Sequence, residues 1–371
     1  MLSSSMVEDA VPLEALRRAL IIKLRHHGDV LLASPVFSAL KRRAPAAELD
    51  ALVYADTEPM LSGHPSISRV HGIDRSWKEL GPVARARREW ALFRELRSRR
   101  YDLVVHLTEN WRGAWLARTL GARWAVAPRV PGRGRLWRNS FTHLVPTPLA
   151  GGRHVVESNL DALRRIGIHP PREERALTLV AGPVAEERVA RLLAERGLSG
   201  QTFVQVHPSS RWRFKCWPAQ KMAALIDRLH GHGIRVVLTA APDRTEAKMV
   251  EEIESRLAQP VAANLAGALS LKELAALTAQ ARLFVGVDSA PMHIAAAVGT
   301  PAIAIFGPSG ADLWGPWGKP RLGEHRVVAS EAHTCRPCGL DGCGGGKISD
   351  CLVTLEVERV WLAASELLGV R

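Results

Sequence analysis

The sequence predicts an α/β protein made of two doubly wound domains, each a parallel sheet with helices on both faces. Its 371 residues are more than a single hydrophobic core usually serves. Short apolar runs alternate with segments of helical periodicity along most of the chain. A stretch rich in proline and charge, residues 167–183, separates two such series. These observations predict two domains joined by a linker.

The individual elements are predicted from their hydrophobic periodicity. The predicted strands are short and mostly apolar, at residues 19–24, 49–54, 103–107, 124–127, 203–207, 235–240, 283–287 and 302–306. The predicted helices carry apolar residues at helical spacing, at residues 30–44, 90–99, 155–166, 185–196, 218–230, 245–256, 271–279 and 292–298. The alternation of strand and helix implies parallel sheets.

These elements divide the chain into five parts. We expect an N-terminal extension at 1–18, a first domain at 19–170, a linker at 171–183, a second domain at 184–354 and a closing C-terminal helix at 355–371. In a doubly wound sheet, ligands bind beyond the carboxyl ends of the strands. We therefore expect the two domains to face each other across a cleft that holds the site.

The chain is strongly basic, with 50 lysines and arginines against 37 acidic residues and a net charge of +13. This excess predicts an anionic partner: a nucleic acid, an acidic membrane surface or a phosphorylated substrate. The arginine-rich stretch at 85–100 is interpreted as a solvated helix face. The stretch at 129–138 is interpreted as a loop whose arginines converge on an anion. No nucleic-acid-binding signature accompanies the charge.

The sequence also indicates a cellular setting. No apolar run approaches the ~20 residues needed to cross a bilayer. The N-terminus lacks the basic and apolar regions of a signal peptide. We therefore expect a cytoplasmic protein.

Four of the five cysteines lie in one glycine-rich segment near the C-terminus: Cys335, Cys338, Cys343 and Cys351. The first pair has the spacing of a zinc knuckle, but no second C-x-x-C follows. In a cytoplasmic chain disulfides are not expected. We interpret the four residues as a buried thiol cluster that packs the loop, with a structural zinc site as the alternative.

The densest cluster of candidate functional residues follows the predicted strand at 283–287. Asp288 and Ser289 lie at the turn, and a helix of small residues that carries His293 begins near Ala290. The N-terminus of such a helix attracts phosphate through its backbone N–H groups and its dipole. The cluster therefore predicts a diphosphate site, although a capped core helix would explain Asp288 alone.

Two further loops follow predicted strands in the second half. Ser209, Ser210 and Lys215 offer hydroxyls and an ammonium that suit phosphate oxygens and the charge of a leaving group. On its own this loop would be interpreted as a solvated basic turn. Asp243 precedes a helix, where it can accept hydrogen bonds from ribose hydroxyls or cap the helix.

The turn after the first strand contains Gly28 and Asp29. A phosphate loop needs several glycines, whereas here one glycine stands beside a carboxylate that would repel phosphate. A carboxylate at the end of the first strand is well placed as a general base for an acceptor hydroxyl that attacks an activated sugar. Gly28 would let the acceptor approach the backbone. Helix capping is an alternative and compatible role for Asp29.

The sequence contains no D-x-D pair that could hold Mg²⁺ against a nucleotide diphosphate. The charge of the diphosphate must then be met by Lys215, Ser209, Ser210 and helix-end amides. The sequence thus predicts a transferase that requires neither a metal nor another cofactor.

Several segments together resemble a known family. The segments IIKLRHHGDVLLASPVFSALKRRAP at 21–45 and VDSAPMHIAAAVGTPAIAIFGPS at 287–309 resemble the ADP-heptose:lipopolysaccharide heptosyltransferases, glycosyltransferase family 9. RHHGDVLL, DRSWK, HPSSRWRFKCW and VDSAP look most like the lipopolysaccharide core heptosyltransferase III branch. The resemblance covers most of the chain from about Leu20. It implies a GT-B fold with Rossmann-like domains, acceptor binding in the first domain, ADP-heptose in the second, and an inverting transfer without a metal.

The resemblance also implies roles for individual residues. Asp29 falls on the catalytic base proposed for the family and Lys215 on its phosphate-contacting lysine. The expected donor-binding residues are Ser209, Ser210, Lys215, Asp243, Asp288, Ser289, Ala290 and His293. The expected acceptor-binding residues are Arg25, His26, Gly28, Arg112 and Arg129. The cysteine segment and the N-terminal extension receive no role.

The implied acceptor is a phosphorylated, lipid-linked oligosaccharide of the lipopolysaccharide inner core. Peripheral contact with the anionic inner face of the inner membrane is therefore expected, because each Lys or Arg near an anionic leaflet contributes ~1 kcal/mol. This partner explains the basic first half better than nucleic acid does. Two alternatives remain: another GT-B nucleotide-sugar enzyme, such as a heptosyltransferase with a different acceptor or a 2-epimerase, and a basic nucleic-acid-binding protein.

Overall fold

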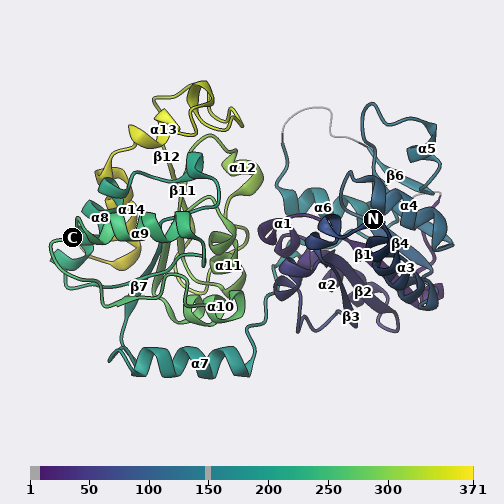
Figure 1. Cartoon of the computed structure of the whole chain (residues 1–371), viewed down its shortest axis with the longest axis horizontal. Coiled ribbons are helices and arrows are strands. Elements are labelled where there is room, and N and C mark those ends of the chain that lie inside the picture. The colour runs from purple at the N-terminus through teal and green to yellow at the C-terminus, as the bar shows by residue number, and fades with distance from the viewer. Residues whose placement is uncertain (1–8, 147–151, 371) are drawn as a thin grey trace, which may run out of the picture. The chain divides into compact units, whose positions relative to one another are not determined.

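The computed structural model describes residues 9–146 and 152–370. The chain divides into two compact units, Met1–Thr178 (unit 1) and Leu179–Arg371 (unit 2) (Figure 1). The division falls inside the segment predicted as a linker. Each unit is a six-stranded parallel sheet flanked by helices.

Unit 1 follows the predicted alternation of strand and helix. Its strands are β1 (Arg18–Ile22), β2 (Glu48–Tyr54), β3 (Arg69–Ile73), β4 (Leu103–His106), β5 (Trp124–Pro128) and β6 (His143–Val145). Its helices are α1 (His27–Leu31), α2 (Ser34–Arg43), α3 (Pro82–Ser98), α4 (Trp111–Thr119), α5 (Arg135–Arg138) and α6 (Val155–Arg164). Four short 3₁₀ helices, Leu13–Ala15, Ala55–Met60, Arg75–Glu79 and Arg172–Arg175, complete the described part.

Unit 2 repeats this plan. Its strands are β7 (Phe203–His207), β8 (Arg235–Leu238), β9 (Ala263–Asn264), β10 (Leu283–Val287), β11 (Ala302–Phe306) and β12 (Arg326–Ala329). Its helices are α7 (Pro183–Ala194), α8 (Ala219–Gly231), α9 (Arg244–Glu254), α10 (Leu271–Gln280), α11 (Ala290–Val298), α12 (Ala311–Trp314), α13 (Asp350–Val353) and α14 (Val357–Leu368). Two 3₁₀ turns lie at Arg213–Lys215 and Cys343–Gly345.

The two sheets have the same topology. The strand order is β3-β2-β1-β4-β5-β6 in unit 1 and β12-β11-β10-β7-β8-β9 in unit 2, and every neighbouring pair is parallel. In each sheet the order reverses between two central strands, β1 and β4 in one and β7 and β10 in the other. Such a switch point opens a crevice at the carboxyl edge of the sheet, where ligands of doubly wound folds bind.

Buried side chains from both faces of each sheet make the cores. In unit 1, Leu92 and Leu96 of α3 and Leu116 of α4 pack against the sheet. Gly113 lets α4 lie close to β4, because a Cβ there would stand 2.1 Å from the His106 ring. In unit 2, Val360, Trp361 and Ala364 of α14 join the core beside α8.

Several elements differ from the sequence-based expectation. The helix predicted at 30–44 is two helices, because Pro35 has no N–H to continue the hydrogen bonds of the first; the second helix begins at Ser34. Strands β3, β6, β9 and β12 were not predicted. The loop predicted at 129–138 includes the helical turn α5. The described end of the expected N-terminal extension, from Asp9, lies against unit 1, where Asp9 pairs with Arg165; residues 1–8 lie outside the described residues.

Candidate active site

The switch point of unit 1 positions Asp29. Strand β1 ends at Ile22, four residues connect it to α1, and Asp29 lies in the first turn of that helix. The N-cap is His26, whose side chain makes no capping hydrogen bond, so capping is not the role of Asp29. The Asp29 side chain is 15% exposed, and its Oδ1 lies 3.9 Å from Nε of Arg25. Asp29 is thus a carboxylate near the surface with a loose ionic contact to Arg25.

Lys23 lies beneath this turn and was not among the predicted site residues. It is 5% exposed, and its Nζ donates to the carbonyl of Leu107 (3.2 Å) and to Oδ1 of Asn159 (2.9 Å). Burial lowers the pKa of Lys23 to about 8, although the negative charge of Asp29 opposes this shift. Asn159 also donates to the carbonyl of Leu32 just after α1 (3.0 Å).

The consequence is a buried cation fixed behind the candidate base. The Lys23 ammonium joins the carboxyl ends of β1 and β4, and Asn159 of α6 ties it to the end of α1. The network therefore orients the turn that carries Asp29.

The other acceptor candidates differ in their availability. His26 and Arg25 are exposed beside Asp29, and Gly28 is in the first turn of α1. Arg112 is engaged with Glu89, at 2.6 Å between NH2 and Oε1. Arg129 is exposed just after β5. Arg25, His26 and Gly28 therefore lie together, whereas Arg112 and Arg129 lie on separate elements after β4 and β5.

The convergence of the arginines at 129–138 on an anion stays a prediction, and the structure gives Arg133 a packing role. Arg133 lies over the rings of Trp111 and Trp137, at 4.9 and 5.5 Å from their centroids, and donates to the carbonyl of Glu109. Its guanidinium thus helps to pack the loop.

In unit 2, Lys215 and Asp288 meet at the switch point. Lys215 follows β7 and Asp288 follows β10, the two strands between which the order reverses. Nζ of Lys215 lies 2.6 Å from Oδ2 of Asp288. The Asp288 side chain is 6% exposed and that of Lys215 23%. Asp288 therefore fixes the lysine, whose remaining N–H donors are available to an anion.

Ser209 and Ser210 have different roles in the structure. Ser209 is buried and its hydroxyl donates to Oε2 of Glu246 (2.7 Å), which also accepts the backbone N–H of Ala241. This hydroxyl is therefore committed to the protein. Oγ of Ser210 accepts the backbone N–H of Trp212 (3.3 Å), so its own proton can be donated to a ligand.

Asp243 is the N-cap of α9. Its Oδ1 accepts the backbone N–H groups of Thr245 (2.9 Å) and Glu246 (3.3 Å), and the residue is exposed. The capping role is therefore present, and the second carboxylate oxygen remains available. Sequence reasoning missed Glu246, which is buried and accepts the Ser209 hydroxyl. The sequence signal that could have found it is its position three residues after Asp243, the spacing of a capping box at a helix N-terminus.

Helix α11 begins beside the Lys215–Asp288 pair. Ser289 is its N-cap and donates its hydroxyl to the carbonyl of Val287 (3.3 Å), and Ala290 is the first helical residue. His293 lies buried one turn further. The interpretation of Asp288 as a cap is wrong, because its carboxylate pairs with Lys215 and no side chain caps the helix. Backbone N–H groups at this helix start add to the positive potential of Lys215.

The four-cysteine segment does not form the buried cluster that we expected. Cys335 and Cys343 are exposed and Cys338 is half-buried, whereas Cys351 is buried. Burial raises the pKa of the Cys351 thiol. Within residues 9–146 and 152–370, no group of three or more His, Cys, Asp or Glu side chains is arranged to hold a metal ion.

Comparison with known proteins decides the family. The model of glycosyltransferase family 9 (heptosyltransferase) matches residues 89–339. The chain belongs to this family. It is 42% identical over 295 residues to "Lipopolysaccharide heptosyltransferase 3" of Escherichia coli, covering 79% of this chain and 84% of the relative. The resemblance noted in the sequence is confirmed.

Solved structures of the family have the same fold. The glycosyltransferase family 9 structure from Veillonella parvula superposes with a TM-score of 0.81 at 21% identity, covering 97% of this chain and 99% of that one. "E. coli heptosyltransferase WaaC with ADP" superposes with a TM-score of 0.70 at 21% identity, covering 94% and 99%. The predicted GT-B class, with two doubly wound domains, is thereby confirmed for this glycosyltransferase.

No helix in the described parts of the chain is both long enough and apolar enough to span a bilayer.

Proposed function

We propose that the protein transfers a heptose from ADP-L-glycero-β-D-manno-heptose to the heptose region of the lipopolysaccharide inner core, with inversion at the anomeric carbon and without a metal. Membership of family 9 and the 42% identity to a lipopolysaccharide heptosyltransferase 3 support the donor and acceptor classes. The observation that carries the proposal is the chemistry of the two switch points: a near-surface carboxylate in unit 1, and a lysine beside a helix N-terminus in unit 2.

Asp29 acts as the general base. Its carboxylate takes the proton from an acceptor hydroxyl as the hydroxyl oxygen forms a bond to C1 of the heptose. The bond between C1 and the phosphate oxygen breaks in the same displacement, so the configuration at C1 inverts and ADP leaves. Buried Lys23 supports this role, because its hydrogen bonds to Leu107 and Asn159 fix the turn that carries Asp29.

Unit 2 holds the donor and receives the charge of the leaving group. Lys215 and Ser210 donate to the diphosphate, together with N–H groups at the start of α11 near Ala290. Asp288 and Ser289 position these donors, and His293 lies beneath them in α11. Asp243 accepts hydrogen bonds from the ribose.

Unit 1 binds the acceptor, whose phosphates match the positive charge of its arginines. The residues that contact it are Arg25, His26, Gly28, Arg112 and Arg129.

The acceptor is lipid-linked, so the enzyme works at the cytoplasmic face of the inner membrane. The net charge of +13 supports peripheral contact with anionic lipid.

The test is acceptor-dependent release of ADP in the presence of EDTA. We expect purified protein to release ADP from ADP-heptose only when a heptose-containing core acceptor is added. Release of free nucleotide without acceptor would instead indicate an epimerase-like enzyme. Tight, salt-sensitive binding of random duplex DNA that ADP-sugars do not affect would indicate a nucleic-acid-binding protein.

A further inference from the structure

One face of unit 1 exposes large aromatic side chains next to arginines. We define the α3–α4 surface as Trp90, Phe93, Arg94 and Arg97 of α3 with Trp111 and Trp115 of α4. Trp90 is 58% exposed and Trp115 is 62% exposed. The Phe93 ring lies between them, 5.5 Å from the centroid of Trp90 and 6.2 Å from that of Trp115. Contiguous exposed aromatic side chains of this kind mark an interaction surface.

The order of residues on α3 alternates aromatic and basic side chains along one side. Arg94 follows Trp90 by four residues and Arg97 follows Phe93 by four, so each guanidinium lies one helical turn beyond a ring. On α4, Trp111 and Trp115 have the same spacing and both are exposed. An amphipathic surface of tryptophan and arginine on helices is typical of attachment to a bilayer interface.

Helix α3 carries five arginines and two glutamates, so its acidic residues offset only part of its positive charge. Glu89 is paired with Arg112, and Glu95 lies 2.7 Å from Nδ1 of the buried His71. Arg87 and Arg94 make no ion pair within the described parts of the chain. The α3–α4 surface therefore presents net positive charge to its surroundings.

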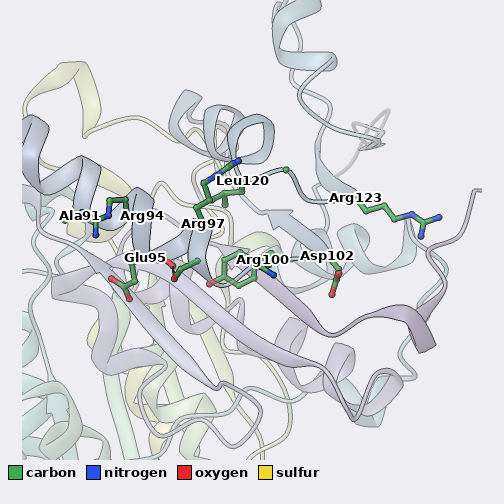
Figure 2. A pocket seen from close by; sticks show the side chains of 11 residues that line it. Ala91, Arg94, Glu95, Arg97, Arg100, Asp102, Leu120 and Arg123 are labelled. Atoms are coloured by element: carbon green, nitrogen blue, oxygen red, sulfur yellow. Dashed lines mark hydrogen bonds between the residues drawn. The ribbon is translucent and has the colours of Figure 1, made fainter.

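A basic depression of about 1040 Å³ adjoins the end of α3. Figure 2 shows the side chains that line it, which come from α3, from the connection between α3 and β4, and from the turn between α4 and β5. Its charged residues are Arg94, Glu95, Arg97, Arg100, Asp102 and Arg123. Asp102 already accepts two backbone N–H groups, those of Arg17 and Arg18, and Glu95 contacts His71. The four arginines give this depression a net positive charge, and Arg97 also donates to the carbonyl of Thr119. The depression lies at the amino edge of β4 and β5, so it extends the basic character of α3 away from the edge that carries Asp29.

We propose that the α3–α4 surface docks this protein on an anionic lipid bilayer. Trp90 and Trp115 enter the headgroup region, where their amphipathic rings are most stable, and the arginines contact lipid phosphates. Helix α4 begins at the carboxyl edge of β4, the neighbour of β1, so Trp111 lies on the side of the sheet edge from which α1 and Asp29 also start. The inference deepens the proposed function, which requires access to a lipid-linked acceptor.

The experiment is co-sedimentation with vesicles of phosphatidylglycerol and phosphatidylcholine, or of phosphatidylcholine alone. The test variant is W90S/R94E, a pair four residues apart on α3. The control is V184S/R188E, an exposed pair with the same spacing on α7 of unit 2. We expect W90S/R94E to bind the anionic vesicles at least about tenfold more weakly than the wild type, and the control to bind like the wild type. Neither variant is expected to change transfer to a water-soluble acceptor fragment.

Three results would overturn the docking surface. They are no binding of the wild type to anionic vesicles, binding of W90S/R94E as tight as that of the wild type, and losses of binding that are equal in W90S/R94E and in the control V184S/R188E. A shift of the wild type to a dimer that W90S/R94E abolishes would instead assign the surface to a second copy. Quenching of wild-type tryptophan emission by brominated phosphatidylglycerol provides a test that needs no variant; its absence contradicts the proposal. Failure of the soluble-acceptor assay in the wild type would refute the proposed function and leave vesicle binding as a separate result.

Discussion

The switch points of the two units have the same topology and opposite arrangements of charge. In unit 1 the lysine is buried and the aspartate is near the surface: Lys23 is 5% exposed, and Oδ1 of Asp29 lies 3.9 Å from Nε of Arg25. In unit 2 the aspartate is buried and the lysine is more accessible: Asp288 lies 2.6 Å from Lys215.

The difference teaches how one fold supports two tasks. A carboxylate with a loose partner can face a substrate, whereas one bonded to an ammonium at 2.6 Å serves to position that ammonium. Unit 1 therefore offers a base at its switch point, and unit 2 offers a fixed cation for phosphate. Four changes test this comparison, from the largest expected effect to the smallest.

Replacing the base should have the largest effect. We expect Asp29→Asn to lower kcat for heptose transfer by about 10²–10⁴-fold, because general-base catalysis contributes that much. Binding of ADP, followed by calorimetry, should stay close to the wild-type value. Asp161→Asn, the same change in a surface ion pair of α6, is the control and should leave both quantities nearly unchanged. An active Asp29→Asn enzyme would refute the assignment.

Removing the cation of unit 2 should weaken donor binding. Lys215→Met eliminates a charged hydrogen bond to phosphate, worth about 1.5–3 kcal/mol, so we expect ADP to bind about 10–100-fold more weakly. If Asp288 acts by positioning Lys215, then Asp288→Asn should weaken binding in the wild-type background and have little further effect in Lys215→Met. Additive losses would show that the two residues contact the donor independently.

Removing the buried cation of unit 1 should have an intermediate effect. In Lys23→Met kcat/KM for heptose transfer should fall by about tenfold, because the turn that carries Asp29 loses the hydrogen bonds that hold it in place. Leu107 and Asn159 lose their donor, so the free energy of unfolding should fall by about 1–3 kcal/mol. Lys41 of α2 donates to the carbonyl of Ala47 in the same way. Lys41→Met removes this bond and is the control; it should leave kcat/KM nearly unchanged.

Stability against pH gives a second measurement on Lys23. The pKa of about 8 is below the usual value of 10.5, so the unfolded chain binds more protons than the folded one between these two values. Unfolding free energy of the wild type should therefore rise relative to Lys23→Met as pH increases from about 8 to 10.5. A constant difference across this range would show that Lys23 keeps its ordinary pKa.

Chelation should have the smallest effect. Incubation with EDTA should change the transfer rate by less than about twofold and leave the melting temperature unchanged. Stoichiometric zinc in the purified protein, with unfolding after its removal, would show that Cys335, Cys338, Cys343 and Cys351 form a structural metal site.

The parts of the fold that sequence patterns predicted best are the central strands. Residues 203–207, 283–287 and 302–306 are strands at the predicted positions, since both faces of a central parallel strand are buried and its apolar run is unbroken. Strands β3, β6, β9 and β12 were missed because they lie toward the sheet edges and are short or carry exposed polar residues.

Much of the candidate site was accessible from the sequence for a similar reason. Asp29, Lys215 and Asp288 follow predicted strands, so their position at the carboxyl edges could be derived from topology alone. The role of Lys23 could not be derived from the sequence, because its hydrogen-bond partner Asn159 is 136 residues away. The bond of Ser209 to Glu246 likewise depends on the packing of two loops, which no local pattern encodes.

The central claim is that Asp29 removes the acceptor proton, and its most direct measurement is single-turnover transfer with saturating ADP-heptose as a function of pH. The wild-type rate should rise with unit slope on the acidic side and then level off, as a single ionised carboxylate requires. In Asp29→Asn the plateau should be at least about 100-fold lower and the acidic limb absent. A variant that keeps the same limb, or a plateau near that of the wild type, would contradict the account.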